Sequence, residues 1–167
     1  MKTIEIKLYE FEELSQKAKE KAMNKYYERE DYYFLSQDLK ESLISLLDER
    51  NVYYRDIKLL YSLSYCQGDG LCFTGILEKN GITLKLSHKY RYYYANSVDM
   101  LFYDQEGEDI EDERTEELKN IYFEICKILE NEGYSILEYR MNDKEFSDLC
   151  AANGYYFTED GIMKTIK

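Results

Sequence analysis

The hydrophobic and polar positions of the chain follow two periods, which predict helices near the ends and a sheet in the middle. Alternating apolar and charged residues predict a first strand over residues 3–9. Helical spacings then predict one helix that Ser15 caps and a second helix from about Ser36 to Asn51. The apolar faces of these two helices consist of Leu14, Ala18, Ala22 and Tyr26, and of Leu39, Leu43, Leu46 and Leu47.

From residue 57 the period changes to two, which is typical of strands. Alternation predicts strands over residues 57–65, 71–78 and 82–86, and a fourth strand fits residues 97–103. Asn80-Gly81 separates the second strand from the third, and both residues tolerate the positive φ of a type I′ turn. The sequence therefore predicts an antiparallel meander.

The last third of the chain returns to helical spacing. One apolar face predicts a helix over residues 118–129, which Gly133 is expected to end in a left-handed conformation. Asn142 begins a capping box for a short helix, and Asn153-Gly154 ends that helix. The remaining residues, 155–166, predict a terminal hairpin.

Together these elements predict a single α+β domain over residues 1–167. Its antiparallel sheet is expected to have about four to six strands and to be covered by N- and C-terminal helices. A chain of 167 residues is long enough to bury roughly two-thirds of its unfolded surface. No segment has the ~20 apolar residues of a membrane-spanning helix, and the N-terminus lacks the apolar core of a signal peptide. We therefore expect a cytoplasmic protein that does not bind membranes.

Composition narrows the choice of partners. The chain has 34 acidic and 22 basic residues, and its net charge of −12 repels nucleic acid and favours partners with basic surfaces. Acidity also serves solubility alone. The 19 tyrosines are of a type enriched at protein interfaces, and they are compatible with a homodimer. Four cysteines without paired spacing and one histidine indicate reduced thiols, no metal site and no cofactor.

The first candidate site is Gln67-Gly68-Asp69-Gly70, between two predicted strands. Two glycines around an aspartate permit unusual backbone angles or the close approach of a partner. Asp69 is suited to bind a cation, to accept hydrogen bonds from a ligand or to cap its own turn. The segment fits neither the dinucleotide-binding nor the P-loop glycine spacing. A structural turn and a binding site are both consistent with these residues.

The second candidate is residues 88–94, His-Lys-Tyr-Arg-Tyr-Tyr-Tyr, the one basic and aromatic cluster of the sequence. Arginine and tyrosine suit phosphate recognition and base stacking, and they equally suit packing across the strands of a half-exposed sheet. If the third strand continues through this segment, alternate side chains project to one side of the sheet. Those side chains are His88, Tyr90, Tyr92 and Tyr94.

The third candidate is the acidic run of residues 104–117, which has nine carboxylates and one arginine and a formal charge of −8. Its Gly107 is misplaced for a calcium-binding helix–loop–helix. Carboxylates spread over a surface imitate a phosphate backbone and fit a groove lined with Lys and Arg, whereas a solvated loop is the simpler interpretation. The partner-binding residues that mimicry predicts are Asp104, Glu106, Glu108, Asp109, Glu111, Asp112 and Glu113.

Catalysis has little support in the sequence. A nucleophile–histidine arrangement would depend on His88, and no nucleophile-elbow or oxyanion sequence accompanies it. Pairs of carboxylates are abundant, but none of them has a spacing that indicates a particular catalytic site. We therefore expect a protein that binds rather than an enzyme.

Three stretches resemble a family of small phage and prophage proteins. Residues 64–73 read Ser-Tyr-Cys-Gln-Gly-Asp-Gly-Leu-Cys-Phe, similar to a Ser-Tyr-Ser-Gln-Gly-Asp-Gly-x-x-Phe signature of that family. The opening Phe-Glu-Glu-Leu-Ser-Gln-Lys-Ala of residues 11–18 and the closing Ala-Asn-Gly-Tyr-Tyr-Phe-Thr-Glu-Asp-Gly of residues 152–161 also resemble its members. A His-x-x-Arg-Tyr-Tyr segment is similar to residues 88–93. Such proteins are often labelled "antitoxin of toxin–antitoxin stability system".

The resemblance, the charge and the missing catalytic residues lead to one hypothesis. It is a phage- or prophage-encoded, anti-CRISPR-like inhibitor of a bacterial defence system, whose acidic, tyrosine-rich surface binds a basic nucleic-acid-binding effector of the host. One alternative is a sponge protein for a nucleotide or cyclic nucleotide. Its ligand-binding or partner-binding residues would be Gln67, Asp69, His88, Arg91, Tyr92 and Tyr94. The other alternative, which the family label implies, is an antitoxin that neutralises a toxin protein.

Overall fold

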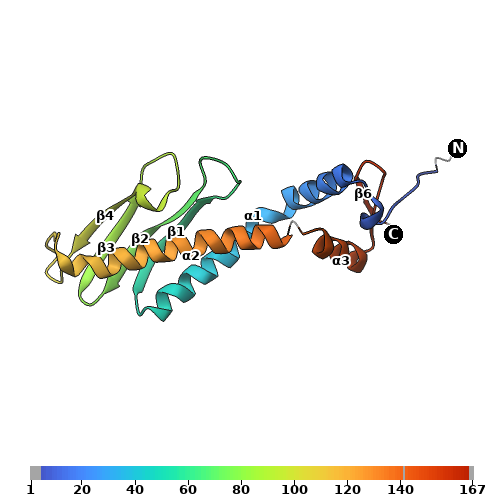
Figure 1. Cartoon of the computed structure of the whole chain (residues 1–167). Helices are drawn as coiled ribbons and strands as arrows, with labels where there is room; N and C mark the ends of the chain where they lie inside the picture. Colours follow the sequence, from blue (N-terminus) through green and yellow to red (C-terminus); the bar gives the residue numbers. More distant parts are fainter. Residues whose placement is uncertain (1–4, 141, 166–167) are drawn as a thin grey trace. The chain divides into compact units, whose positions relative to one another are not determined.

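The computed structural model describes residues 5–140 and 142–165, except the side chains of residues 28–33 and 140 (Figure 1). The fold is α+β, as predicted. Its helical elements are η1 (Phe11–Glu13), α1 (Gln16–Glu49), η2 (Ala95–Ser97), η3 (Glu113–Thr115), α2 (Glu116–Arg140) and α3 (Asp143–Asn153). Its strands are β1 (Tyr53–Ser62), β2 (Gly70–Lys79), β3 (Ile82–His88), β4 (Val98–Tyr103), β5 (Tyr155–Phe157) and β6 (Met163–Thr165).

The chain packs as two compact units. Unit 1 combines the residues up to 34 with those from 135 onward, and unit 2 comprises residues 35–134. The single domain over residues 1–167 stays a prediction.

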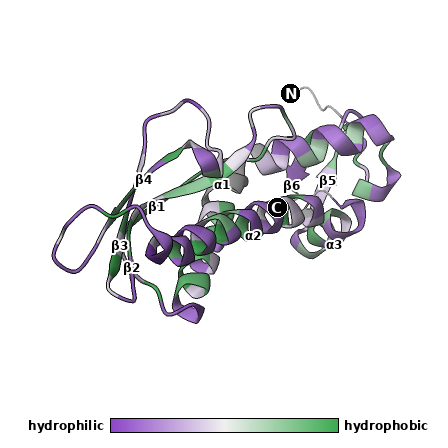
Figure 2. Cartoon of the chain, turned by 60° about the vertical axis from the view of Figure 1, so that its left-hand side comes forward, coloured by the Kyte–Doolittle hydropathy of each residue, from purple (hydrophilic) through white to green (hydrophobic). Residues whose placement is uncertain are grey.

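Unit 2 is built on a four-stranded antiparallel sheet in the order β1-β2-β3-β4, which confirms the predicted meander. Asn80 (φ 51°) and Gly81 (φ 78°) form the predicted turn between β2 and β3. The unit 2 parts of α1 and α2 lie along one face of the sheet (Figure 1). Figure 2 shows that hydrophobic residues concentrate on the strands and on these helices, whereas the connecting loops are hydrophilic. Fully buried core residues are Leu39, Leu43, Leu47, Leu71, Phe73, Leu77, Leu84, Tyr122, Ile125 and Leu129.

The first strand differs from its predicted bounds of 57–65, because β1 begins at Tyr53 and ends at Ser62. A bulge lies between Arg55 and Lys58, and Asp56 has a φ of 55°. The bulge shifts the alternation of apolar residues by one position, so the start of the strand does not fit a period-two pattern. The strand ends early because the amides of Ser64 and Cys66, after Ser62, turn toward the Asp69 carboxylate.

The two helices predicted before residue 52 are one helix, α1, which runs without a break from Gln16 to Glu49. The predicted start is confirmed, because the Ser15 hydroxyl accepts a hydrogen bond from the Ala18 amide at 3.3 Å. The predicted second start at Ser36 is wrong. The chain has no proline, and its first glycine is Gly68, so nothing in this stretch forces the helix to end.

The prediction that Gly133 ends the next helix is also wrong, since α2 continues through Gly133 to Arg140. The glycine instead makes room for Leu63, whose Cδ1 occupies the place that a Cβ on residue 133 would need. Glycine thus has a packing role here within a helix. A helix C-cap and a site of close approach both favour glycine, so the sequence pattern does not distinguish them.

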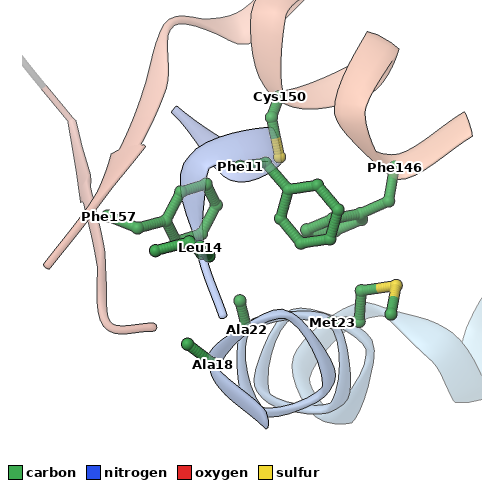
Figure 3. Packing of buried hydrophobic residues seen from close by; sticks show 8 residues of the cluster. All are labelled: Phe11, Leu14, Ala18, Ala22, Met23, Phe146, Cys150 and Phe157. Carbon is green, nitrogen blue, oxygen red and sulfur yellow. The ribbon is translucent and has the colours of Figure 1, made fainter. Parts of the chain in front are cut away.

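Unit 1 has its own apolar core, which the two ends of the chain build together (Figure 3). The rings of Phe11 and Phe146 lie 4.8 Å apart, and those of Phe11 and Phe157 lie 5.9 Å apart, all in edge-to-face contact. Figure 3 shows these rings over the α1 residues Ala18 and Ala22. The small alanines allow η1, α3 and the terminal hairpin to approach this part of α1 closely.

The short elements of unit 1 begin and end largely as predicted. The Asn142 side chain accepts hydrogen bonds from the amides of Lys144 (2.9 Å) and Glu145 (3.4 Å), and Gly154 ends α3 with a φ of 65°. Strands β5 and β6 pair as the terminal hairpin. The last predicted residue of this hairpin, 166, lies outside the described residues.

The predicted N-terminal strand over residues 3–9 is not confirmed. Residues 3 and 4 lie outside the described part of the chain, and residues 5–8 have no strand structure. Only Tyr9 pairs, as an isolated bridge in which its amide donates to the Phe157 carbonyl at 2.8 Å. Strand β5 has just three residues and already pairs with β6, so it offers little backbone for a longer partner.

We predict that Gly161→Ala destabilises the chain more than Gly154→Ala does. Both glycines have positive φ, 79° and 65°, so both substitutions carry a backbone cost of about 1–2 kcal/mol. At Gly161 the new Cβ would also collide with the backbone carbonyl of Ala18, whereas at Gly154 it would meet nothing within 4 Å. Denaturant unfolding measures both free energies, and equal losses would contradict the packing described here.

Candidate functional site at the two ends of the unit 2 sheet

The acidic loop, defined as residues 104–113, follows β4 and folds back along it. The Asp104 amide donates to the Glu108 carbonyl at 3.0 Å, and the Ile110 amide donates to the Phe102 carbonyl at 3.1 Å. Tyr103 and Asp109 form an antiparallel bridge, and Ile110 is buried. The loop is therefore ordered by the edge of the sheet, and it also covers part of that edge.

Two of its predicted partner-binding residues, Asp104 and Asp112, hold the loop in shape. The Asp104 carboxylate accepts hydrogen bonds from the amides of Glu106 (3.0 Å) and Glu108 (2.9 Å). The Asp112 carboxylate accepts from the Arg114 amide at 2.9 Å and from its guanidinium at 2.7 Å. These bonds to Arg114 lower the pKa of Asp112. Both aspartates are thus engaged within the chain.

The other five predicted residues of the acidic loop are free to meet a partner. They are exposed, and among the described residues none of their carboxylates has a hydrogen bond or an ion pair. The arginine of the run is paired with Asp112 and also interacts electrostatically with Glu106, so a single positive charge leaves most of their negative charge uncompensated. The five residues are Glu106, Glu108, Asp109, Glu111 and Glu113. The loop therefore presents a concentrated negative charge on a fixed backbone.

Asp69 organises the loop between β1 and β2. Its carboxylate accepts hydrogen bonds from the amides of Ser64 (2.8 Å) and Cys66 (3.3 Å) and from the hydroxyl of Tyr134 on α2. Burial alone would raise the pKa of Asp69, but the hydrogen bonds, from Tyr134 first, outweigh it and lower that pKa. Burial and Asp69 together raise the pKa of Tyr134. The carboxylate therefore closes its own loop and faces into unit 2.

The two glycines beside Asp69 allow the segment of residues 89–94 to lie against this loop. A Cβ on Gly70 would lie 2.8 Å from the Tyr93 carbonyl oxygen, and one on Gly68 would lie 3.1 Å from the Tyr92 ring. The Tyr94 hydroxyl donates to the Gln67 carbonyl at 3.0 Å. The structure thus brings together the first two candidate sites of the sequence.

The third strand does not continue through residues 88–94, which was the condition for placing alternate side chains on one face. Strand β3 ends at His88, which pairs with Val98, the first residue of β4, so residues 89–97 form the connection between the two strands. His88 Nε2 lies 2.9 Å from the Tyr92 carbonyl oxygen and closes this connection. His88 and Tyr94 are half-buried, whereas Arg91 and Tyr92 are exposed. The alternate side chains therefore do not form one strand face.

The acidic loop and the tyrosine-rich loops lie at opposite ends of the sheet. Strand β4 begins beside the connection of residues 89–97 and ends at the acidic loop (Figure 1). Its six residues span about 20 Å at the usual rise of a strand. The single acidic, tyrosine-rich surface of the hypothesis is therefore two surfaces.

Sequence reasoning missed two tyrosines at the second of these ends. Tyr134 is the partner of Asp69, and the exposed ring of Tyr65 belongs to the same loop as Asp69. A local pattern gives no signal for Tyr134, because it lies 65 residues from Asp69 along the chain. Tyr65 lies two residues before the candidate segment that begins at Gln67 and could have been found there.

Within residues 5–140 and 142–165, no helix is long and apolar enough to cross a membrane. In the same residues no group of three His, Cys, Asp or Glu side chains is arranged to hold a metal ion. No protein-family model matches the chain, and comparisons with curated proteins and with solved structures give no significant match.

We predict that Asp69→Asn lowers the free energy of unfolding at pH 7 by roughly 1–2 kcal/mol, because amides and a hydroxyl lose a charged acceptor. The pKa of Asp69 is lower in the folded chain than its usual 3.8, so its stabilisation is present above that value. The stabilisation is lost as the pH falls through the folded pKa. Denaturant unfolding between pH 7 and pH 3 measures the difference between variant and wild type.

The matched control is Asp109→Asn, which removes an exposed carboxylate without a partner and is expected to change stability by less than about 0.5 kcal/mol. A loss as large in this control as in Asp69→Asn would contradict the role of Asp69. A loss in Asp69→Asn that stays constant down to pH 3 would contradict the charge-assisted bonds.

Proposed function

We propose that the chain is a phage- or prophage-encoded inhibitor that acts in the bacterial cytoplasm, and that its acidic loop binds a basic, nucleic-acid-binding defence effector without catalysis. One observation carries the proposal: five exposed carboxylates stand on a loop whose backbone Asp104 and Asp112 hold in place. The phage origin rests on the resemblance of residues 64–73 and of the two ends of the chain.

Fixed carboxylates suit this kind of binding. A groove that holds nucleic acid presents Lys and Arg at the positions of phosphates, and a set of carboxylates on an ordered loop offers the same charge. Because the loop is already ordered, little backbone entropy is lost when it binds. Each exposed ion pair contributes only about 0–1 kcal/mol, so the affinity of the loop depends on several pairs together and falls with salt.

The two alternatives have weaker support. A nucleotide sponge requires the loops around Asp69 and Arg91 to meet, which they do, but the Asp69 carboxylate already accepts hydrogen bonds from within the chain. It has little capacity left for the edge of a base. An antitoxin would use the same acidic loop against a basic toxin. The only support for this alternative is the family label.

We predict that four amide substitutions abolish inhibition. The amide variant combines Glu106→Gln, Glu108→Gln, Asp109→Asn and Glu111→Gln, which change the net charge from −12 to −8 and keep side-chain size. Bacteria that carry one of a panel of CRISPR–Cas or restriction systems would express the chain and be challenged with a targeted phage. We expect the wild type to restore plating against at least one system, and the amide variant to lose about 100-fold or more of this effect, since ~3 kcal/mol of binding is removed.

The matched control makes the same charge change on exposed carboxylates of unit 1, with Glu20→Gln, Glu138→Gln, Asp148→Asn and Glu159→Gln. It is expected to inhibit like the wild type. Equal inhibition by the amide variant would contradict a role for the acidic loop. A wild type that restores plating against no system would contradict the proposed function itself.

A further inference from the structure

We infer that the opposite end of the unit 2 sheet is a second protein-binding surface, one that accepts an acidic side chain flanked by apolar side chains. This aromatic surface consists of Tyr65, from the loop of residues 63–69, and of Tyr90, Arg91 and Tyr92, from the connection of residues 89–97. It goes beyond the proposed function, because it uses other residues and attracts the opposite charge.

Three rings stand out of the surface. Tyr65 is 64% exposed, Tyr90 is 56% exposed and Tyr92 is 44% exposed, although the chain is large enough to bury them. An aromatic side chain contributes about 150–250 Å² when it is covered, so three of them provide a substantial part of a contact area. The two loops that carry these rings lie against each other, at Gly68 beside the Tyr92 ring and at the Tyr94 hydroxyl bonded to Gln67, and exposed apolar area is typical of interaction sites.

The rings are held in place before any partner arrives. The Tyr90 hydroxyl donates to Asp99 at 3.2 Å, and the Tyr65 ring lies 5.0 Å from the Tyr134 ring. The Tyr92 ring lies 5.6 Å from the Tyr94 ring, whose hydroxyl is bonded to Gln67. Rings that are already fixed lose little conformational entropy on binding, which favours affinity.

The connection between β3 and β4 is further fixed from inside unit 2. The buried Tyr122 hydroxyl of α2 donates to the Ala95 carbonyl at 3.1 Å, and Gly70 allows the Tyr93 backbone to pack directly on the start of β2. The two loops contain five tyrosines and one arginine, the residue types that antibody loops use as aromatic anchors and at binding hot spots.

The charge of this surface identifies its partner. Lys89 and Arg91 are exposed, and neither has an ion pair among the described residues of a chain with 34 acidic residues. The Arg91 guanidinium lies 5.4 Å from the centre of the Tyr92 ring, which leaves its N–H groups available. The carboxylates nearby, Asp69 and Asp99, already accept hydrogen bonds from Tyr134 and Tyr90. A carboxylate from a partner is therefore the complementary group.

A protein segment fits better than a nucleic acid. A net charge of −12 repels a polyanion over its whole length, whereas a single carboxylate meets only its local surroundings. The acidic loop is about 20 Å away along β4, beyond the Debye length of about 8 Å at physiological salt. Its charge therefore does not prevent an acidic side chain from reaching Arg91.

A library of random 12-residue peptides displayed on phage tests this inference on the immobilised full-length chain. We expect the enriched peptides to share Asp or Glu next to aromatic or aliphatic residues. Synthetic copies of them are expected to bind at least about 10-fold more weakly to the triple variant Tyr90→Ser, Arg91→Ala and Tyr92→Ser, as measured by fluorescence polarisation. The single variant Arg91→Glu is expected to select peptides with Lys or Arg instead.

The amide variant of the acidic loop serves as the control and is expected to select the same acidic peptides as the wild type. Three results would overturn the inference: no enrichment over the empty support, enrichment of basic peptides only, or the same peptides selected by Arg91→Glu. Displacement of the peptides by a mononucleotide at equal concentration would also overturn it in favour of a nucleotide site. None of these results depends on inhibition by the acidic loop.

Discussion

Hydrogen bonds from backbone amides to three aspartates fix the loops at both ends of the unit 2 sheet. Asp69 closes the loop between β1 and β2, while Asp104 and Asp112 shape the loop after β4. A carboxylate that accepts amide hydrogen bonds is a strong local anchor, because charge-assisted bonds are about twice as strong as neutral ones. The other carboxylates of the acidic loop gain nothing comparable from the fold, and this contrast separates structural from candidate functional residues.

The opening segment (residues 11–18), the closing segment (residues 152–161) and the segment around Asp69 (residues 64–73) have separate structural roles. In unit 1 the opening segment supplies Phe11 and Ala18, and the closing segment supplies Phe157 and Gly161, which lies against the Ala18 backbone. In unit 2 the motif around Asp69 makes the loop to which residues 89–94 are fitted. Packing thus accounts for much of these three segments, whereas it does not explain the acidic loop and the exposed tyrosines.

Local chemistry made part of this structure predictable. The Asn80-Gly81 turn, the cap at Asn142 and the glycine after α3 each depend on a few neighbouring residues, and all three are confirmed. Features that depend on distant contacts were missed. Gly133 was interpreted as a helix end because Leu63 lies 70 positions away in sequence, and Tyr134 gave no sign of its bond to Asp69. The acidic loop and the tyrosines are separated because they lie at opposite ends of strand β4. The predicted meander already implied this separation, but the sequence analysis did not apply it to the candidate sites.

The central claim is that the free carboxylates of the acidic loop are kept for binding and do not stabilise the fold. Denaturant unfolding of the wild type and the amide variant at about 20 mM and about 500 mM salt tests it most directly, since salt screens repulsion between exposed charges. The account predicts an amide variant that is more stable than the wild type by several tenths of a kcal/mol to about 1 kcal/mol at low salt, with a gap that closes at high salt. An amide variant that is less stable than the wild type at both salt concentrations would show that these carboxylates support the fold, and it would contradict the claim.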